Sequence, residues 1–454
     1  MDYAISIAPS VLTSDGYLKN SAYLALRMVF PMLLETALTR LIKIGTLSVR
    51  FPDGSTRTFG SGREPRASIS IKTERAKRRL LLNPALALGE LYMDDEIEPG
   101  PRGLFQTLDF LAMNSMEGGS HPFDKFMEKV RWFRRNLDQL NFAARSKRNV
   151  AHHYDLDGRL YSLMLDEDRQ YSCAYFPDGD ETLEEAQLKK KRHIASKLRL
   201  DRPGLEVLDI GCGWGGMALY LAREFGARVT GLTLSEEQLK EARARAKEAQ
   251  LDHIVTFELM DYRNWTRPVD RVVSVGMFEH VGVNHFRTYF DKIKSILADD
   301  GVALVHAIGR ADGPGSTNPW IAKYIFPGGY SPAISEVMSV VEKSGLWATD
   351  IEVLRLHYAK TLEQWYQRFA DNRNKLVQMY DERFCRMFEF YLIGSELAFR
   401  RMGHINWQIQ LTKNVSTLPL ARDYIFDAER NSAAKDNANS DLTAVGWERQ
   451  REMS

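Results

Sequence analysis

The chain has 454 residues, of which 44% are hydrophobic and 27% are charged, and its formal net charge is +1. This length allows two or more domains with a large core, and the balanced charge excludes a general attraction to nucleic acid. Three cysteines without metal or disulfide spacing predict a cytoplasmic protein without a metal site. Because no long apolar run and no signal-peptide pattern occur, we expect membrane contact to be peripheral.

Residues 1–120 are predicted to form a small mixed α+β domain. The pattern predicts an amphipathic helix at 16–44 and a hairpin around a Pro-Asp-Gly turn at 45–59. A further strand is predicted at 67–71, and a further helix begins at residue 84. Pro31 breaks or kinks the first helix. This part carries no catalytic motif, so we interpret it as an accessory domain for dimerisation or lipid presentation.

Residues 121–150 are predicted to form a basic linker helix. Arginines and lysines alternate there with Phe126, Trp132 and Phe133. Such a helix can lie on anionic lipid, and a solvated linker is the alternative. A second basic run, 189–192, begins about one helical turn after Glu184 and Glu185. We therefore expect part of this run to stabilise the helix through ion pairs with these acids.

From residue 204 onwards, strands alternate with helices. The predicted strands are 206–210, 228–233, 254–259, 269–275 and 301–306, and Ser235 is a good N-cap for the helix after the second strand. This alternation predicts a parallel α/β sheet. We assign residues 151–422 to this domain and expect the polar tail, 423–454, to be disordered.

The first of these strands leads into a glycine-rich turn. Gly211, Gly213, Gly215 and Gly216 follow it directly, and a helix-forming run begins at Met217. Such a turn binds a nucleotide-like ligand at the carboxyl end of the strand. The spacing differs from the dinucleotide pattern G-x-G-x-x-G, and the preceding Asp209 suits the amino-acid cation of S-adenosylmethionine. We therefore predict a methyltransferase, with a dinucleotide enzyme and a structural turn as alternatives.

The ends of the next two strands supply further candidates for this pocket. Class I methyltransferases often have an acidic residue at the end of the second strand, but here Thr233 and Gln238 occupy that region. Both can donate and accept hydrogen bonds, so we expect them to hold the ribose. Asp261 follows strand three and is expected to accept from the adenine amino group, with a turn cap as the alternative.

Three further motifs are specific: YSCAYF at 171–176, VGMFEHVG at 275–282, and HAIG at 306–309 followed by WIAKYIFP at 320–327. Together with 207–216 they resemble the cyclopropane-fatty-acyl-phospholipid synthase family, which is related to mycolic acid cyclopropane synthases. The resemblance covers about residues 150–415. It implies a class I S-adenosylmethionine-dependent methyltransferase with a Rossmann-like, mainly parallel sheet beside the smaller N-terminal domain.

The resemblance also implies a reaction and a set of ligands. The cis double bond of a phospholipid acyl chain attacks the methyl group of S-adenosylmethionine, and a bound bicarbonate removes a proton from the resulting carbocation so that a cyclopropane ring closes. The implied bicarbonate ligands are Glu279, His306 and Tyr358, with backbone groups of Cys173 and Ile308. The predicted donor-binding residues are Tyr171, Ser172, Asp209, Gly211, Gly213, Trp214, Gly215, Thr233, Gln238, Asp261 and Tyr262.

Three other functions stay open at this point. The enzyme could make a methyl- or methylene-branched acyl chain, the protein could be a small-molecule methyltransferase, or it could be a catalytically silent lipid-binding protein. The resemblance implies a homodimer that associates with a bilayer of unsaturated phospholipid at the inner face of the cell membrane. Relatives commonly have a Cys where this chain has Ser395, so we expect no covalent cysteine step. His280 follows strand four at a site position, with a packing or capping role as the alternative.

Overall fold

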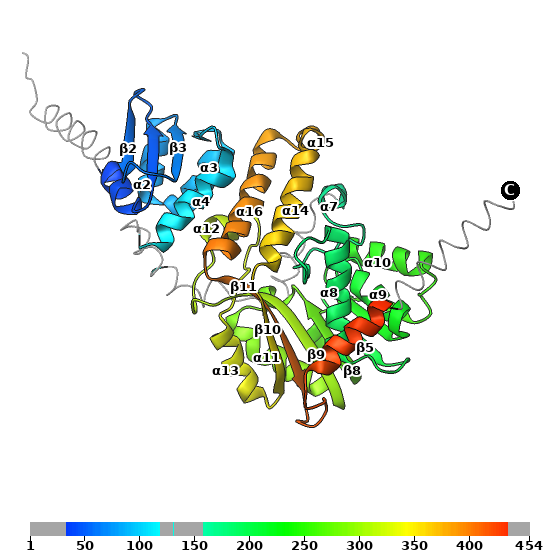
Figure 1. Ribbon diagram of the computed structural model, residues 1–454. Helices are drawn as coiled ribbons and strands as arrows, with labels where there is room; N and C mark the ends of the chain where they lie inside the picture. The colour runs from blue at the N-terminus through cyan, green and yellow to red at the C-terminus, as the bar shows by residue number, and fades with distance from the viewer. Residues whose placement is uncertain (1–32, 119–129, 131–157, 435–454) are drawn as a thin grey trace, which may run out of the picture. The chain divides into compact units, whose positions relative to one another are not determined.

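The computed structural model describes residues 33–118, 130 and 158–434, which belong to two compact units that divide between residues 127 and 128 (Figure 1). The predicted basic linker helix, 121–150, lies outside the described residues apart from Val130. Its contact with lipid therefore stays a prediction.

The first unit is a four-stranded sheet with helices, in the order β2-β1-β3-β4. After a helix at 33–41, its elements are β1 (Thr46–Arg50), β2 (Thr56–Gly60), β3 (Arg66–Ile71), α2 (Glu74–Leu82), α3 (Pro84–Met93), β4 (Ile97–Pro99) and α4 (Gly103–Met116). The predicted hairpin is confirmed, because β1 and β2 pair antiparallel. Helix α4 was not predicted; its Asn114 accepts hydrogen bonds from the backbone N–H groups of Lys43 and Ile44.

The second unit is built on a seven-stranded sheet, in the order β10-β11-β9-β8-β5-β6-β7. Its strands are β5 (Glu206–Ile210), β6 (Arg228–Thr233), β7 (Val255–Leu259), β8 (Val269–Val275), β9 (Leu297–Arg310), β10 (Trp347–Leu354) and β11 (His404–Thr412). The predicted parallel core is confirmed for β5 to β9. Strand β11 pairs antiparallel with both β9 and β10, so the sheet is mixed.

Helices cover both faces of this sheet (Figure 1), with α8 (Leu183–Leu198), α9 (Gly216–Phe225) and α10 (Glu236–Glu248) on one face and α11 (Phe286–Ile296) and α13 (Ile334–Ser344) on the other. The other helices of this unit are α7 (Gly158–Met164), α12 (Pro319–Tyr324), α14 (His357–Asp371), α15 (Arg373–Met379) and α16 (Glu382–Arg401). Alternate residues of β5 enter different cores: Val207 packs with α8, α9 and α10, whereas Leu208 packs with α11 and α13. The result is an α/β/α sandwich with the carboxyl ends of β5, β6 and β8 at one edge.

The prediction of a disordered tail from residue 423 is wrong for its first part, because residues 423–434 form a helix. Ile425 is buried on this helix, and the Tyr424 hydroxyl accepts a hydrogen bond from the Gln410 side chain at 2.7 Å. The ring of buried His193 lies between the carboxylates of Glu352 and Glu429. The sequence of this segment is polar because residues such as Glu429 bind partners elsewhere in the fold. The helix therefore lacks the apolar stripe by which a packed helix is usually recognised.

The His193 contact predicts a pH-dependent stability. Burial alone lowers the pKa of His193, but its hydrogen bonds to Glu352 and Glu429 outweigh burial and raise it. A raised folded-state pKa gives stability that is fully present below about pH 6.5 and is lost as the pH rises through the folded-state value. We expect Glu429→Gln to lower the free energy of unfolding by about 1.5–3 kcal/mol at pH 6 and by much less at pH 8.5, as measured by denaturant titration.

The matched control is Asp427→Asn on the same helix, since Asp427 pairs with Arg430 at the exposed surface. Exposed pairs of this kind contribute little, so this variant should match the parent protein at both pH values. An equal loss for Glu429→Gln at pH 6 and pH 8.5 would contradict a role for protonated His193.

Candidate active site

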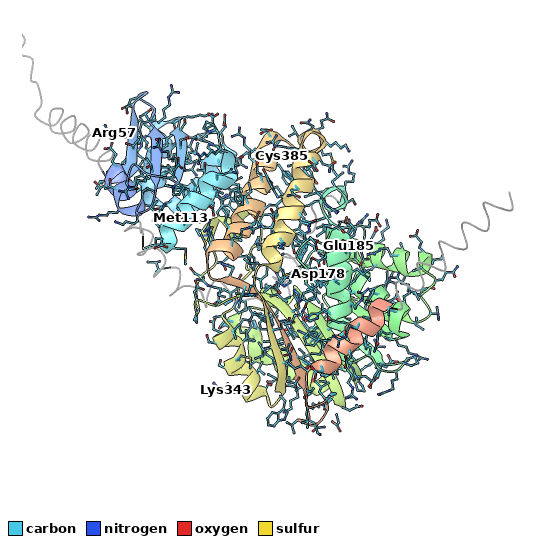
Figure 2. The ribbon with its side chains drawn as sticks, viewed as in Figure 1. Arg57, Met113, Asp178, Glu185, Lys343 and Cys385 are labelled. Carbon is cyan, nitrogen blue, oxygen red and sulfur yellow. The ribbon has the colours of Figure 1, made fainter. Side chains whose placement is uncertain are left out.

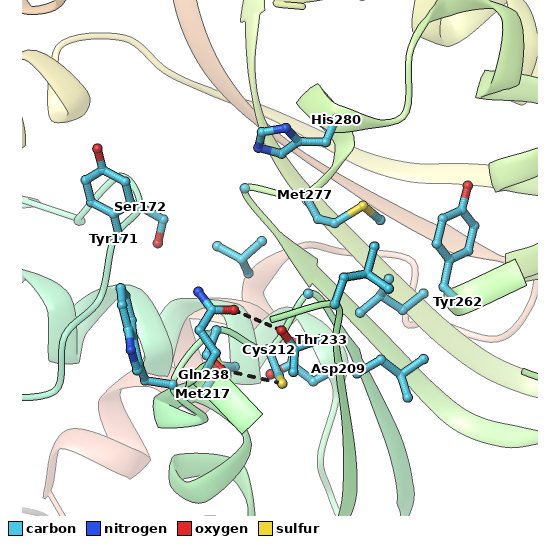
Figure 3. A pocket seen from close by; sticks show the side chains of 18 of the residues that line it. Tyr171, Ser172, Asp209, Cys212, Met217, Thr233, Gln238, Tyr262, Met277 and His280 are labelled. Atoms are coloured by element: carbon cyan, nitrogen blue, oxygen red, sulfur yellow. Dashed lines mark hydrogen bonds between the residues drawn. The ribbon is translucent and has the colours of Figure 1, made fainter. Parts of the chain in front are cut away.

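A pocket opens at the carboxyl ends of β5, β6 and β8 (Figure 3). Its walls come from residues 169–172, the glycine turn, the start of α10, the region after β7 and the region after β8. This is the edge of an open α/β sheet at which ligands bind.

The predicted donor-binding residues meet at this pocket, with one exception. Those that line it are Tyr171, Ser172, Asp209, Gly211, Gly213, Trp214, Thr233, Gln238, Asp261 and Tyr262. The exception, Gly215, precedes α9 and has φ +84°, and a Cβ there would lie 2.6 Å from Cζ of Phe257. Gly215 is therefore required for close packing of the turn against the core, and not for direct contact with a ligand.

The glycine turn places one acid at the bottom of the pocket. The backbone N–H groups of Gly211 and Cys212 both donate to the carbonyl of Leu232, which ties the turn to β6. Asp209 is buried, and its Oδ2 has no hydrogen-bond partner among the described residues. Burial raises the pKa of Asp209 to about 7, although the charge of Lys190 opposes the shift. Such an unpaired carboxylate oxygen suits a cationic ligand group.

The polar residues after β6 and β7 are fixed by local hydrogen bonds. Thr233 Oγ1 donates to Gln238 Oε1 at 2.9 Å (Figure 3), and Ser235 caps α10 as predicted. Because the Gln238 carbonyl is occupied, its amide N–H groups are left to donate to a ligand. Asp261 accepts from the backbone N–H of Arg263 at 3.0 Å and forms an ion pair with its guanidinium. Asp261 therefore caps a turn and also lines the pocket.

Helix α8 holds the wall formed by residues 170–172. The helix begins with a capping box between Thr182 and Glu185. The Gln187 side chain donates to the carbonyls of Gln170 and Ser172 at 3.1 and 3.0 Å. The predicted support of this helix by Lys189 and the acids at 184 and 185 is not what the structure shows, because Lys189 pairs with Asp178 and Glu181. Lys190 and Lys191, in the same basic run, are buried.

Gly216 allows this wall to approach α9. A Cβ at Gly216 would lie 2.3 Å from Nε2 of Gln170 and 2.5 Å from Oδ2 of Asp168. We expect Gly216→Ala to displace the wall and to lower affinity for S-adenosylhomocysteine by about tenfold or more, since a buried hydrogen-bond network is disturbed. Isothermal titration calorimetry would measure this loss.

The control is Gly394→Ala in α16, where an added Cβ meets nothing within 4 Å. This change should leave affinity unaltered and stabilise the fold by about 0.5–1 kcal/mol through helix propensity. Unchanged affinity in Gly216→Ala would show that the wall does not control the pocket.

Beside the donor pocket, the structure joins Glu279 to Ile308, which lies two residues after His306 on β9. The Ile308 N–H donates to Glu279 Oε1 at 2.6 Å. Across the strands, Gln408 Nε2 lies 3.0 Å from His306 Nδ1. The carbonyl of His306 accepts from the N–H of Gly276, which lines the donor pocket. This second site therefore adjoins the first through β8 and β9.

Both side chains present an unsatisfied polar atom. Glu279 Oε2 and His306 Nε2 are buried without a hydrogen-bond partner among the described residues. Burial raises the pKa of Glu279 to about 7, opposed by the Ile308 hydrogen bond, and burial lowers the pKa of His306 well below its usual range. His306 is therefore neutral. With Gln408 donating to Nδ1, its proton lies on Nε2, so the pair offers one acceptor and one donor.

The other two predicted residues are placed by α14. Tyr358 is buried near the start of that helix and packs edge-on against Phe399, with ring centroids 4.9 Å apart. Cys173 is buried, and the N–H of the next residue, Ala174, donates to Thr361 on α14 at 3.0 Å. Burial raises the pKa of the Cys173 thiol, so its side chain is a poor nucleophile.

Sequence reasoning missed Gln170, Gly216 and Met277, which line the donor pocket. His280 also lines it (Figure 3), which favours a place in the site over a packing or capping role. Burial lowers the pKa of His280 to about 4, so it is neutral at pH 7. The available signal was position, because Met277 and His280 directly follow β8 at the ligand edge. The neighbouring Phe278 belongs to the core instead, where it stacks on Phe286.

The sheet, the glycine turn and the pocket at its edge define a class I S-adenosylmethionine-dependent methyltransferase. Residues 142–409 match the family described as mycolic acid cyclopropane synthetase, and the chain belongs to this family. Residues 33–108 match a domain family of unknown function.

Individual relatives agree with this assignment. The chain is 38% identical to the cyclopropane-fatty-acyl-phospholipid synthase of Escherichia coli, over 77% of this chain and 88% of that protein. It is 38% identical to the tuberculostearic acid methyltransferase UfaA1 of Mycobacterium tuberculosis, over 56% of this chain and 62% of that protein. The structure of the mycolic acid cyclopropane synthase CmaA1 with SAH and CTAB superposes with a TM-score of 0.56 at 32% identity, covering 58% of this chain and 97% of that chain.

Proposed function

We propose that this methyltransferase builds cyclopropane rings on the cis-unsaturated acyl chains of membrane phospholipids. The proposal rests on two buried atoms, Glu279 Oε2 and His306 Nε2, that have no partner among the described residues. The His306 carbonyl also accepts a hydrogen bond from Gly276, which lines the donor pocket. The name of the Escherichia coli relative gives the substrate class. When bound, S-adenosylmethionine supplies an electrophilic methyl group, and the unpaired oxygen of Asp209 and the predicted residues around it are the groups that would hold it.

The second site fits a bicarbonate ion, which would supply the base for ring closure. Glu279 Oε2 can accept from the hydroxyl of such an ion, and His306 Nε2 can donate to an oxygen. Tyr358 and the backbone N–H of Cys173 are further ligands in the proposal. Ile308 is the remaining predicted ligand, and its backbone N–H donates to Glu279, which positions that carboxylate.

A carbocation on the acyl chain must be protected from water, and we infer that the aromatic side chains around Tyr391 on α16 serve this purpose. Tyr171 and Tyr391 share a hydrogen bond at 3.0 Å, and Phe326 packs edge-on against Tyr391. Ser395 lies half-buried on α16. Burial raises the pKa of Cys385, on the same helix, to about 11, which supports a mechanism without a cysteine nucleophile (Figure 2).

The substrate would reach the enzyme from a bilayer, so we propose peripheral association with the inner face of the cell membrane, and a homodimer. Within the described residues, no helix has both the length and the apolar character that a membrane span requires. The candidate surface is the basic stretch 122–148. Charge reversal of Arg134, Arg135, Arg145 and Arg148 should weaken binding to anionic vesicles in a sedimentation assay; unchanged binding would place the surface elsewhere.

A second candidate function is methyl transfer that gives a branched acyl chain. The similarity to a tuberculostearic acid methyltransferase supports this candidate. Both reactions begin with the same attack on the donor and differ in which proton leaves. Fatty acids from a host that lacks its own synthase, expresses this chain and receives methyl-labelled methionine would separate the two by mass spectrometry. A labelled methylene in a ring supports cyclopropanation, whereas label in a branched or alkene-containing chain supports the second candidate. Unaltered lipids would contradict both.

A further inference from the structure

Lys190 is a buried cation directly behind the donor pocket, and none of the chemistry proposed above uses it. It lies in the middle of α8, and its relative exposure is 0%. Its Nζ donates to Gln170 Oε1 at 2.6 Å and to Ser172 Oγ at 3.0 Å. Both acceptors line the pocket. A buried lysine is costly unless its ammonium group is well paired, so its partners here indicate a specific role.

The direction of these hydrogen bonds fixes the Ser172 hydroxyl. An ammonium group can only donate, so Ser172 Oγ must accept from Lys190. Among the hydrogen bonds of the described residues, Ser172 Oγ takes part only as this acceptor. A hydroxyl has one proton to donate, and that proton is therefore available to a ligand in the pocket. Gln170 is held in place, because its Nε2 also donates to Asp168 at 3.0 Å.

The charge of Lys190 is suited to an anionic ligand group. Burial lowers its pKa to about 8, while Asp166 and Asp168 oppose the shift, so the side chain is mainly protonated at pH 7. The arginines that line the pocket are already paired, Arg169 with Glu241 and Arg263 with Asp261. S-adenosylmethionine carries one carboxylate and one ammonium group at its amino-acid end, and Asp209 already suits the ammonium group.

We propose that Lys190 is a positioning residue for the carboxylate of the methyl donor. It orients Ser172 so that the hydroxyl proton points toward that carboxylate, and it places a positive charge behind the contact. The inference requires only that the chain binds S-adenosylmethionine. It does not depend on the bicarbonate ion or on the lipid substrate.

Two probes separate binding of the donor's amino-acid end from binding of its nucleoside in the full chain. S-adenosylhomocysteine has the amino-acid carboxylate, and 5′-methylthioadenosine lacks the whole amino-acid end. We expect Lys190→Met to lower affinity for S-adenosylhomocysteine by about 10–100-fold, the range for a lost hydrogen bond to a charged group. Affinity for methylthioadenosine should stay unchanged. Both are measured by isothermal titration calorimetry, independently of turnover.

Further variants separate positioning from general support of the fold. Ser172→Ala should reduce the preference for S-adenosylhomocysteine in the same way, and the double variant should add little, because both changes remove one path. Lys190→Arg should restore part of the preference. The matched control is Lys197→Met: this lysine is equally buried on α8 but binds Glu352 and Asp350. It should lower stability without changing the ratio of the two affinities.

The proposal fails if Lys190→Met weakens both probes equally, since Lys190 would then only support the pocket wall. It also fails if neither affinity changes, and Arg169 would then be the next candidate for the carboxylate. If Lys190→Met does not fold, Ser172→Ala decides alone: an unchanged ratio of affinities overturns the proposal. None of these outcomes alters the test of the lipid product.

Discussion

In the Glu279→Gln variant we expect turnover to fall by about 10²–10³-fold, the range typical of groups that act in proton transfer, with no loss of S-adenosylhomocysteine binding. Glu279 is buried and does not line the donor pocket, so the substitution should leave donor binding intact. The amide keeps one oxygen for the Ile308 N–H but replaces the unpaired acceptor, Oε2, with a donor. The proposed bicarbonate hydroxyl then has no acceptor.

The pH dependence of the rate gives a second test of the contribution of Glu279. Burial raises the pKa of Glu279 to about 7, so the carboxylate loses its function as the pH falls through this value. The rate at saturating donor should therefore decline below about pH 7 in the parent protein, and this limb should be missing in Glu279→Gln. A variant that keeps the limb would show that another group titrates.

Two controls make the result specific. Glu90→Gln removes a buried glutamate of the first unit that pairs with Arg79, and it should leave turnover unchanged. Removal of carbonate from the buffer should slow the parent protein, and added bicarbonate should restore its rate. If Glu279→Gln responds to bicarbonate as the parent does, Glu279 is not a ligand of that ion.

The Asp209→Asn variant should lose most of its affinity for the methyl donor, by about 10–100-fold, because a charge-assisted hydrogen bond to the donor's ammonium group is removed. Asp209 is buried at the end of β5, and its Oδ2 has no partner among the described residues. Asparagine has nearly the same shape, so the glycine turn should keep its conformation. Calorimetry with S-adenosylhomocysteine measures the effect.

The pH dependence of binding identifies the carboxylate. Burial raises the pKa of Asp209 to about 7, so the ionised form that attracts a cation is depleted as the pH falls below this value. Parent affinity should weaken from pH 8 to pH 6, and Asp209→Asn should not show this weakening. Equal pH dependence in the two proteins would assign the ammonium contact to another residue.

The parallel part of the fold was predictable because buried strands appear as short apolar runs. Strands β5, β6 and β8 have the bounds that the sequence predicted. Strand β11 was missed because its buried residues include Asn406, Gln408 and Gln410, which resemble an exposed segment. Their burial is explained only by partners far away in the chain, such as His306.

Those parts of the site whose residues belong to one local sequence motif could be predicted. The glycine turn and its neighbours indicated a donor pocket, and ten of the eleven predicted residues line it. The role of Lys190 was hidden, because a run of basic residues suggests a solvated helix face. Its burial becomes evident only when α8 packs against the segment 170–172. Likewise, the bond between Ile308 and Glu279 follows from strand order, which no local pattern contains.

The insertion of β11 between β9 and β10 also determines when the enzyme can become active during synthesis. Gln408, which orients His306, follows it by 102 positions in the chain. The residues that line the donor pocket all lie between 169 and 281. A nascent chain therefore contains every lining residue of that pocket long before it contains Gln408. Because pairing over such a separation is slow to form, we expect the site for proton removal to be the last part of the active site to assemble.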